Sequence, residues 1–273
     1  MRKIEATKIT GAVIGLVRKA SFFLRSDVLS ALSKAYRAEK NIQAKKILRA
    51  ILDNAAYARK QKLAICQDTG LPVVFVEIGQ DVAVRGDLKE AINKGVREGY
   101  KKYHLRDSIV SDPLSRGRSK SPVCVIHTDT TGGEKIKLTI LPKGFGCENK
   151  SQLRMFKPTA NIKEIKDFIV KVVKDAGPDA CPPYVIGVGI GGSADYAGIM
   201  AKKALLRKIS SRKLKLEKDL LRQINKTGIG PMGLGGANTV LAVHVQTYPT
   251  HIAGLPVSVN ISCHALRSAS VTL

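Results

Sequence analysis

Three cysteines stand where regular structure is expected to break, so their thiols can leave the hydrophobic core. Cys66, Cys181 and Cys263 each lie next to polar residues or prolines. The gaps between them, 115 and 82 residues, exclude a local zinc knuckle. They allow three loops to converge on one soft metal centre, because thiolates bind zinc and iron-sulfur clusters. A cysteine buried as a small hydrophobe is the commoner case, so spacing alone leaves both interpretations open.

Cys124 shows no such placement. Cys124 lies in the apolar pattern of residues 123–126, which predicts a small hydrophobe in a strand. An odd number of cysteines, five in a chain of 273 residues, argues against a disulfide framework.

A glycine pattern follows the second of these cysteines. Gly187, Gly189 and Gly192 fit G-x-G-x-x-G between an expected strand and an expected helix. A dinucleotide-binding unit would need a further strand ending in an acid, but a charged helical stretch follows instead, beginning at residues 205–208. We therefore favour a helix N-terminus whose bare amides approach an anion or a cofactor.

Among the five histidines, His251 is the best placed for proton transfer. It follows Tyr248-Pro249-Thr250 in an expected loop, and an imidazole titrates near neutral pH. His127 and His244 lie in strand patterns, which predicts ordinary core or surface positions.

The chain is strongly basic, with a formal net charge of +24. This charge would attract anionic ligands or nucleic acid, or it reflects the proteome from which the chain comes. Aromatic residues are not interleaved with the basic runs, which weakens a single-strand-binding interpretation. Residues 202–226 contain ten basic residues, and we expect helix, loop and helix with a solvated basic face.

Nothing in the sequence predicts a membrane protein or an exported one. No apolar run approaches the roughly 18 to 20 residues of a membrane span, and no signal peptide is evident at the N-terminus. We therefore expect a cytoplasmic protein.

The periodicity predicts an α/β fold, with a mixed β-sheet core, a helical N-terminal region over about 1–62 and surrounding helices, in a single domain over 1–273. The expected helices cover residues 8–62, 87–102, 161–175 and 194–208. The expected strands cover residues 73–79, 123–127, 135–141, 184–188, 239–245 and 256–262.

Five motifs in order resemble one family from about residue 10 to the C-terminus. They are Cys66-Gln67-Asp68-Thr69-Gly70, Pro142 to Asn149, Cys181-Pro182-Pro183 with Gly187 to Gly192, Gly228-Ile229-Gly230-Pro231, and His251 to Pro256 with Cys263. This order is similar to that in the alpha subunit of class I iron-sulfur fumarate hydratases and L(+)-tartrate dehydratases.

The resemblance implies a hydro-lyase with a 4Fe-4S cluster whose three protein ligands are Cys66, Cys181 and Cys263. One iron is then not ligated by protein, and it can act as a Lewis acid on a substrate hydroxyl. Cys147 is left out of this ligand set. The implied reaction is the hydration of fumarate to malate, a step of the tricarboxylic acid cycle.

The resemblance also implies the residues that contact a small dicarboxylate substrate: Gln67, Asp68, Arg106, Gly144, Gly146 and His251. Arg106 would bind a carboxylate through both prongs of its guanidinium. Asp68 would hand a proton to the departing hydroxyl, and His251 is the second expected catalytic residue.

Two departures from the family pattern qualify the match. Residues 116–121, before Pro122, replace the family's Asn-Thr-Gly-Asp-Asn stretch, and Phe145 and Cys147 stand where fumarases often have Gly and Ser. The stretch Glu148 to Ser151 and the pair Gly191-Gly192 favour fumarate, with L(+)-tartrate dehydration as the alternative.

Single-chain relatives continue into a second catalytic domain, whereas this sequence ends at Leu273. The resemblance therefore implies a separate beta subunit that carries that domain, and a hetero-oligomer. A basic nucleic-acid-binding protein remains the more remote alternative, tested by the salt dependence of duplex binding.

Overall fold

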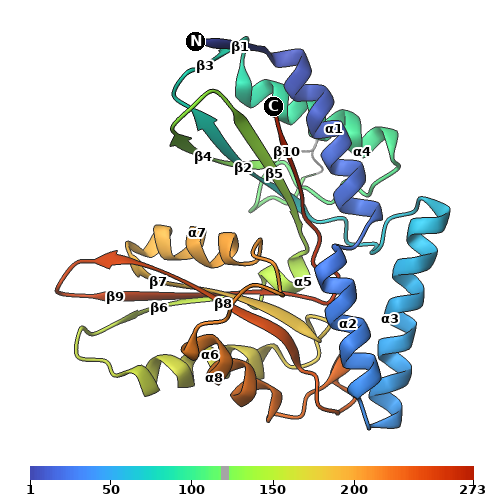
Figure 1. The fold of residues 1–273 in the computed structure, drawn as a ribbon, viewed down its shortest axis with the longest axis vertical. Helices are drawn as coiled ribbons and strands as arrows, with labels where there is room; N and C mark the ends of the chain where they lie inside the picture. The colour runs from blue at the N-terminus through green and yellow to red at the C-terminus, as the bar shows by residue number, and fades with distance from the viewer. Residues whose placement is uncertain (118–122) are drawn as a thin grey trace. The chain divides into compact units, whose positions relative to one another are not determined.

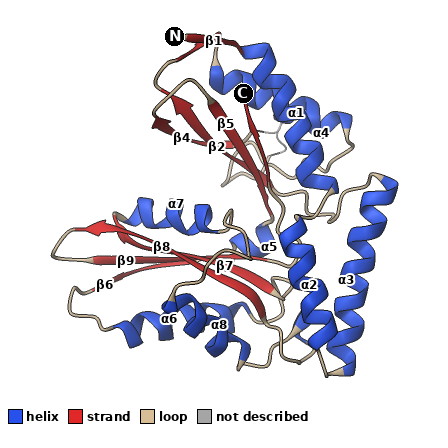
Figure 2. Cartoon of the chain, viewed as in Figure 1, coloured by secondary structure: helices blue, strands red, loops and turns tan. Residues whose placement is uncertain are grey.

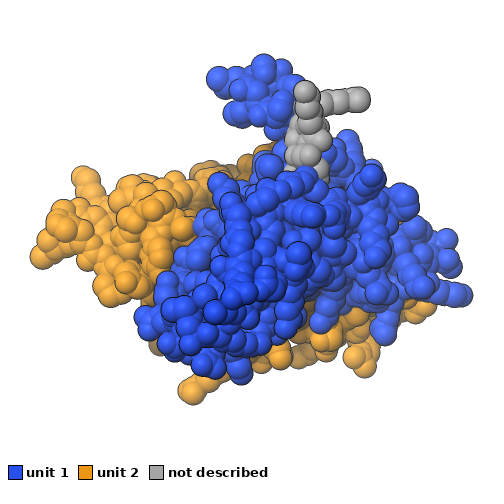
Figure 3. Space-filling view, turned by 90° about the horizontal axis from the view of Figure 1, so that it is seen from above, with its two compact units in different colours: residues 1–24, 57–145, 267–273 blue, residues 25–56, 146–266 orange. Residues whose placement is uncertain are grey.

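The computed structural model describes residues 1–117 and 123–273. The chain forms two compact units, coloured separately in Figure 3. Unit 1 comprises residues 1–24, 57–145 and 267–273, and unit 2 comprises residues 25–56 and 146–266. Both units combine helices with a mixed sheet, which confirms the α/β class. The single domain expected over 1–273 stays a prediction, and residues 118–122 of the loop that departs from the family pattern lie outside the described residues.

Unit 1 is built on a four-stranded sheet in the order β10-β5-β2-β4. Its strands are β2 (Leu71–Gly79), β4 (Val125–Thr131), β5 (Ile136–Lys143) and β10 (Ala269–Thr272). β2 pairs parallel with β4 and antiparallel with β5. Helix α1 (Ala6–Phe22) packs against α4 (Leu88–Lys102) and against β5 (Figure 1). A small parallel pair, β1 (Arg2–Glu5) and β3 (Val82–Arg85), completes the unit.

Unit 2 is a layered structure around a sheet in the order β6-β9-β7-β8. Its strands are β6 (Gln152–Phe156), β7 (Tyr184–Gly192), β8 (Val240–Thr250) and β9 (Leu255–Ser262). Helix α7 (Ala194–Ala204) covers one face, and α6 (Ile162–Ala176) and α8 (Lys215–Asn225) cover the other (Figure 2). Helix α2 (Ser26–Ala38) also contacts β8 in this unit.

The glycine pattern is explained by packing between β7 and α7. A Cβ atom on Gly187 would lie 2.0 Å from the Ala201 carbonyl oxygen, and one on Gly189 would lie 2.1 Å from the Ala197 carbonyl oxygen. Only glycine lets the helix lie this close to the strand. These two positions therefore serve helix–strand packing, and anion binding at the start of α7 stays untested.

Several element bounds differ from those expected. The short strands β1, β3, β6 and β10 were not foreseen, because strands of four or five residues give too little periodicity. Helix α7 ends at Ala204 rather than near residue 208. The guanidinium of Arg25 donates to two carbonyl oxygens just beyond this end, those of Leu205 at 2.9 Å and Arg207 at 2.7 Å. The N-terminal helices are α1, α2 and α3 (Ile42–Gln61).

Candidate functional site

The loop Cys66–Gly70 in unit 1 is held in place by a buried tyrosine. Tyr100 is 3% exposed, and its hydroxyl donates to the carbonyl oxygens of Thr69 at 3.2 Å and Gly70 at 3.0 Å. Burial raises the pKa of Tyr100 well above its usual range, so the hydroxyl keeps the proton it donates. Gly70 has φ +80°, and a Cβ there would lie 2.8 Å from the Lys143 backbone. The loop therefore requires glycine where it enters β2.

The side chain of Asp68 organises this loop. Its Oδ1 accepts from the Gly70 backbone N–H at 3.0 Å, and its Oδ2 accepts from the Phe145 N–H at 2.9 Å. A Cβ on Gly144 would lie 3.0 Å from Oδ2, so the Gly144–Phe145 backbone lies directly against the carboxylate. Asp68 thus ties the cysteine loop to the end of β5.

The structure places Arg106 beside the same loop. The Thr69 hydroxyl donates to the Arg106 carbonyl oxygen at 2.6 Å. The side chains of Arg106 and Gln67 are exposed and accessible to a ligand. Four of the residues predicted to contact substrate, Gln67, Asp68, Arg106 and Gly144, are therefore parts of one arrangement within unit 1.

Arg267 belongs to this arrangement and was missed by the sequence analysis. Its Nη2 donates to the Asp68 carbonyl oxygen at 2.8 Å, and the residue is 3% exposed. Its Nε and Nη1 are buried and have no hydrogen-bond partner among the described residues. A buried guanidinium with two unsatisfied groups is costly. The only sequence signal was its position four residues after Cys263.

In unit 2, Cys181 and Cys263 lie on neighbouring segments. Cys181 precedes β7 and has φ +59°, and Cys263 directly follows β9. The Cys181 carbonyl oxygen accepts from the His264 backbone N–H at 3.4 Å and lies 3.0 Å from the His264 Nδ1. These contacts hold the two cysteine segments together at one end of β7.

His251 lies at the other end of the same strand. Thr250 pairs with Gly192, and its hydroxyl donates to the Gly192 carbonyl oxygen at 2.9 Å. Ser262, next to Cys263, pairs instead with Val185. At about 3.3 Å per residue, the strand from 185 to 192 spans about 23 Å. The structure therefore does not bring His251 together with Cys181 and Cys263 within unit 2.

Two other predictions concern the cysteines left out of the ligand set. Cys147 lies in the short helix α5 (Phe145–Glu148), is buried, and donates from Sγ to the Ala180 carbonyl oxygen at 3.3 Å. Cys124 packs against the core of unit 1, and burial raises its pKa to about 12. Both contacts indicate structural thiols. Gly146, at the start of unit 2, has open space where a Cβ would lie.

The donor set fits an anionic iron-sulfur group, although the described residues contain no group of three His, Cys, Asp or Glu side chains arranged for a metal ion. All five cysteines are thiols rather than halves of disulfides. Cys66 belongs to unit 1, and Cys181 and Cys263 belong to unit 2. A further observation agrees with an anionic group near Cys66. Arg267 is hydrogen-bonded to Asp68, two residues after Cys66, and its buried Nε and Nη1 lack partners among the described residues. A buried cation is stabilised by a nearby anion.

Comparison with known proteins covers almost the whole chain. A family model described as fumarate hydratase (Fumerase) matches residues 10–272. The chain is 42% identical to the "Putative L(+)-tartrate dehydratase subunit alpha" of Methanocaldococcus jannaschii, over 96% of each chain. It is 29% identical to the L(+)-tartrate dehydratase subunit alpha of Escherichia coli strain UTI89 and 28% identical to that of strain K12, over 97% of this chain and 90% of each relative. Separately, none of the described helices combines the length and apolar character needed to cross a membrane.

Proposed function

Because the chain belongs to the fumarate hydratase family of hydro-lyases, we propose that it is the alpha subunit of an iron-sulfur enzyme that reversibly hydrates fumarate to malate. The observation that supports this best is the arrangement around Asp68, in which Gln67, Arg106 and Gly144 lie beside the Cys66 loop. A dicarboxylate that binds there would meet an exposed guanidinium and an oriented carboxylate.

We assign Cys66, Cys181 and Cys263 as the ligands of a 4Fe-4S cluster, following the family resemblance. Their thiol state and the orphaned N–H groups of Arg267 support this assignment. When bound, such a cluster supplies a Lewis-acidic iron for the substrate hydroxyl.

The chain's own residues would bind and protonate the substrate. Arg106 would hold one carboxylate through two parallel hydrogen bonds, which fixes the orientation of the substrate as well as its affinity. Asp68 would hold the proton that goes to the leaving hydroxyl, at the oxygen that otherwise accepts from Phe145. Tyr100 and Arg267 would keep the backbone carbonyls of this loop in register.

His251 and Gly146 complete the proposed substrate contacts, and the position of His251 imposes a condition. Since His251 lies about 23 Å along β7 from the Cys181 and Cys263 segments, it would reach a substrate bound near them only from a second copy of the chain. Activity of mixed assemblies that carry His251→Ala in one copy and Cys181→Ser in another would reveal such sharing.

Dehydration of L(+)-tartrate is the second candidate, favoured by the names of the relatives reported above. The stretch Glu148 to Ser151, which favoured fumarate, supports that choice less strongly once its contacts are known. Glu148 accepts from Lys202 Nζ at 2.5 Å and from Asn260 Nδ2 at 3.1 Å. A carboxylate held by these two contacts has a structural role. It therefore discriminates poorly between the substrates.

The relatives' names include "subunit alpha", which supports a beta subunit as the partner, and we propose cytoplasmic assembly with it. The test is anaerobic co-expression of the two subunits, followed by assays with fumarate and L(+)-tartrate. We expect a higher kcat/KM with fumarate. A higher value with tartrate would establish the second candidate, and a cluster-loaded complex inactive on both would refute each.

A further inference from the structure

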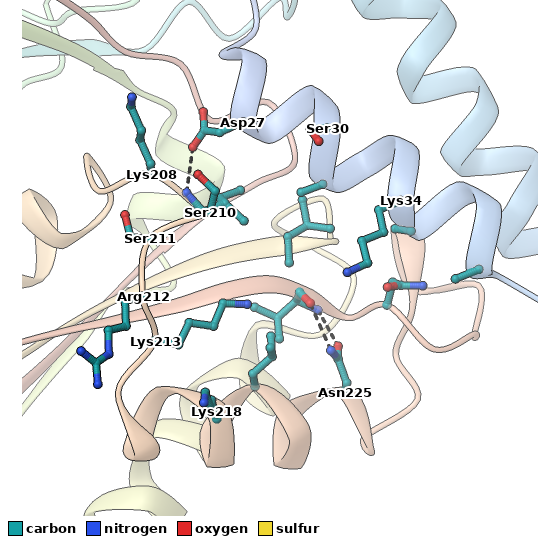
Figure 4. A pocket seen from close by; sticks show the side chains of 18 of the residues that line it. Asp27, Ser30, Lys34, Lys208, Ser210, Ser211, Arg212, Lys213, Lys218 and Asn225 are labelled. Carbon is teal, nitrogen blue, oxygen red and sulfur yellow. Dashed lines mark hydrogen bonds between the residues drawn. The ribbon is translucent and has the colours of Figure 1, made fainter.

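A basic cavity of about 1450 Å³ opens within unit 2 (Figure 4). It lies between α2, α8, the start of β8 and residues 208–214, which join α7 to α8. Its lining contains six cationic side chains: Lys34, Lys208, Arg212, Lys213, Lys215 and Lys218. The proposed hydro-lyase chemistry uses none of them.

The segment that carries most of these cations is fixed at both ends. At the first end, the Ile209 backbone N–H donates to Asp27 Oδ2 at 2.8 Å, and Arg25 holds the carbonyl oxygens just before it. At the second end, the Leu214 N–H donates to Glu217 Oε2 at 2.8 Å. The sequence analysis expected a solvated basic face here. The exposed side chains of Lys208, Arg212, Lys215 and Lys218 agree with that expectation, and the structure adds that the segment is anchored and lines a hollow.

The charges in the cavity are not balanced by the protein. Asp27 is the one acidic residue in the lining, and Arg25 already binds it, with Nη2 2.6 Å from Oδ2. Although burial opposes ionisation, the bonds from Arg25 and the Ile209 N–H lower the pKa of Asp27 overall. Within the described residues, none of the six cations forms an ion pair. Five of them are exposed and Lys213 is half-buried, so water and salt screen part of their mutual repulsion, and a bound polyanion would reduce it further.

The remaining lining indicates the size and character of that anion. The hydroxyls of Ser30, Ser210 and Ser211 stand beside the cations, and apolar side chains from α2, α8 and β8 line the same cavity: Ala31, Ala35, Leu221, Val240 and Leu241. In Figure 4, Lys34 and Lys213 extend into the space below α2 from two different elements. We propose that this cavity binds an organic polyphosphate of nucleotide size, with its phosphates on the lysines and its body on the apolar side chains.

A nucleic acid duplex fits this arrangement less well. Duplex recognition places a protruding helix or strand in a groove and spreads cations along the phosphate backbone. Here the cations line a cavity, and no aromatic side chain in the lining offers a stacking surface for bases. A compact ligand with several phosphates satisfies more of these cations at once.

The test is isothermal titration of the full-length chain, co-purified with its partner subunit, with ATP and with inorganic tripolyphosphate at about 0.15 M salt. The variant Lys34→Gln/Lys213→Gln removes two cavity cations. The control Lys46→Gln/Lys174→Gln removes two exposed cations of α3 and α6 that do not line the cavity. Competition by duplex DNA is measured in parallel.

We expect saturable binding of one ATP per chain, weakened roughly tenfold or more in the cavity variant and less than about twofold in the control. ATP should also bind more tightly than tripolyphosphate, because only ATP has a body for the apolar side chains. Equal weakening in the two variants, equal affinity for the two ligands, tighter binding of duplex at the same lysines, or no saturable binding would each overturn the proposal. None of these outcomes depends on hydro-lyase activity.

Discussion

Replacement of Arg267 by methionine tests whether the unsatisfied guanidinium forms an ion pair with the anionic cluster when the cluster is bound. Methionine preserves most of the length and apolar volume of the side chain and removes the charge. It also removes the 2.8 Å hydrogen bond from Nη2 to the Asp68 carbonyl oxygen. The variant therefore removes one favourable hydrogen bond and also the two buried N–H groups, Nε and Nη1, that lack partners among the described residues.

The structure predicts a small effect on the cluster-free protein and a large effect on the cluster-loaded protein. Without the cluster, loss of the charged hydrogen bond costs about 1.5–3 kcal/mol, and removal of the buried unsatisfied N–H groups returns about 1–3 kcal/mol. The free energy of unfolding should then change by no more than about 1 kcal/mol. With the cluster bound, breaking a buried charge pair costs about 3–5 kcal/mol. Cluster affinity should fall by more than about a hundredfold.

The assays are urea unfolding of the cluster-free chain and iron retention of the reconstituted complex under a chelator challenge. Arg267→Lys keeps the charge without the fork, and we expect an intermediate loss of iron. Arg97→Met is the control, because Arg97 pairs with Glu90 at the surface of the same unit. Equal destabilisation of the cluster-free and cluster-loaded forms by Arg267→Met would refute the reasoning and leave Arg267 a purely structural residue.

Three further predictions follow from the described contacts. The variants Cys66→Ser, Cys181→Ser and Cys263→Ser should each abolish the visible absorption of the anaerobically purified complex, whereas Cys124→Ser should keep it. Equal iron content in all four variants would refute the ligand set. Asp68→Asn removes the proposed acid and places an amide donor against a backbone donor, so kcat should fall at least about a hundredfold. The control Asp87→Asn, at the exposed cap of α4, should keep activity. A near-native kcat in Asp68→Asn would refute the acid role. Burial lowers the pKa of His244 from 6.5 to about 4, so the unfolded chain binds a proton that the folded chain does not, and stability should fall by roughly 3 kcal/mol as the pH drops through this interval. Urea unfolding at several pH values should show a shallower fall in His244→Leu, and an unchanged slope would contradict this assignment.

Local features were predictable from the sequence because they depend on neighbouring residues. The apolar periodicity located α6 and α4 to within one residue. The apolar surroundings of Cys124 predicted its packing against the core of unit 1, whereas the sequence left the role of Cys147 open. The glycine pattern at β7 was located but its packing role was not foreseen, because a glycine needed for helix packing and one needed for ligand approach look alike in a sequence.

Long-range contacts were not predictable in this way. Tyr100 appears in the sequence as one more apolar position on the helical face of α4, yet its hydroxyl bonds to a loop thirty residues away. Arg267 likewise stands 199 residues from Asp68. His244 was expected to be an ordinary strand residue, and its buried ring nitrogens lack partners among the described residues. Such pairings depend on strand register and tertiary packing, which no local pattern encodes.

The two roles of Asp68 compete for the same oxygen. An ionised carboxylate only accepts hydrogen bonds, so it can bind the Gly70 and Phe145 N–H groups together, as observed. A protonated Oδ2 keeps a lone pair that can still accept from the Phe145 N–H, but its O–H must then point away from that group. Proton delivery from Oδ2 therefore requires the substrate hydroxyl to lie on the side of this oxygen that faces away from Phe145. A Cβ at Gly144 would lie 3.0 Å from the same oxygen, so a side chain at this position would crowd the approach of the substrate to Oδ2.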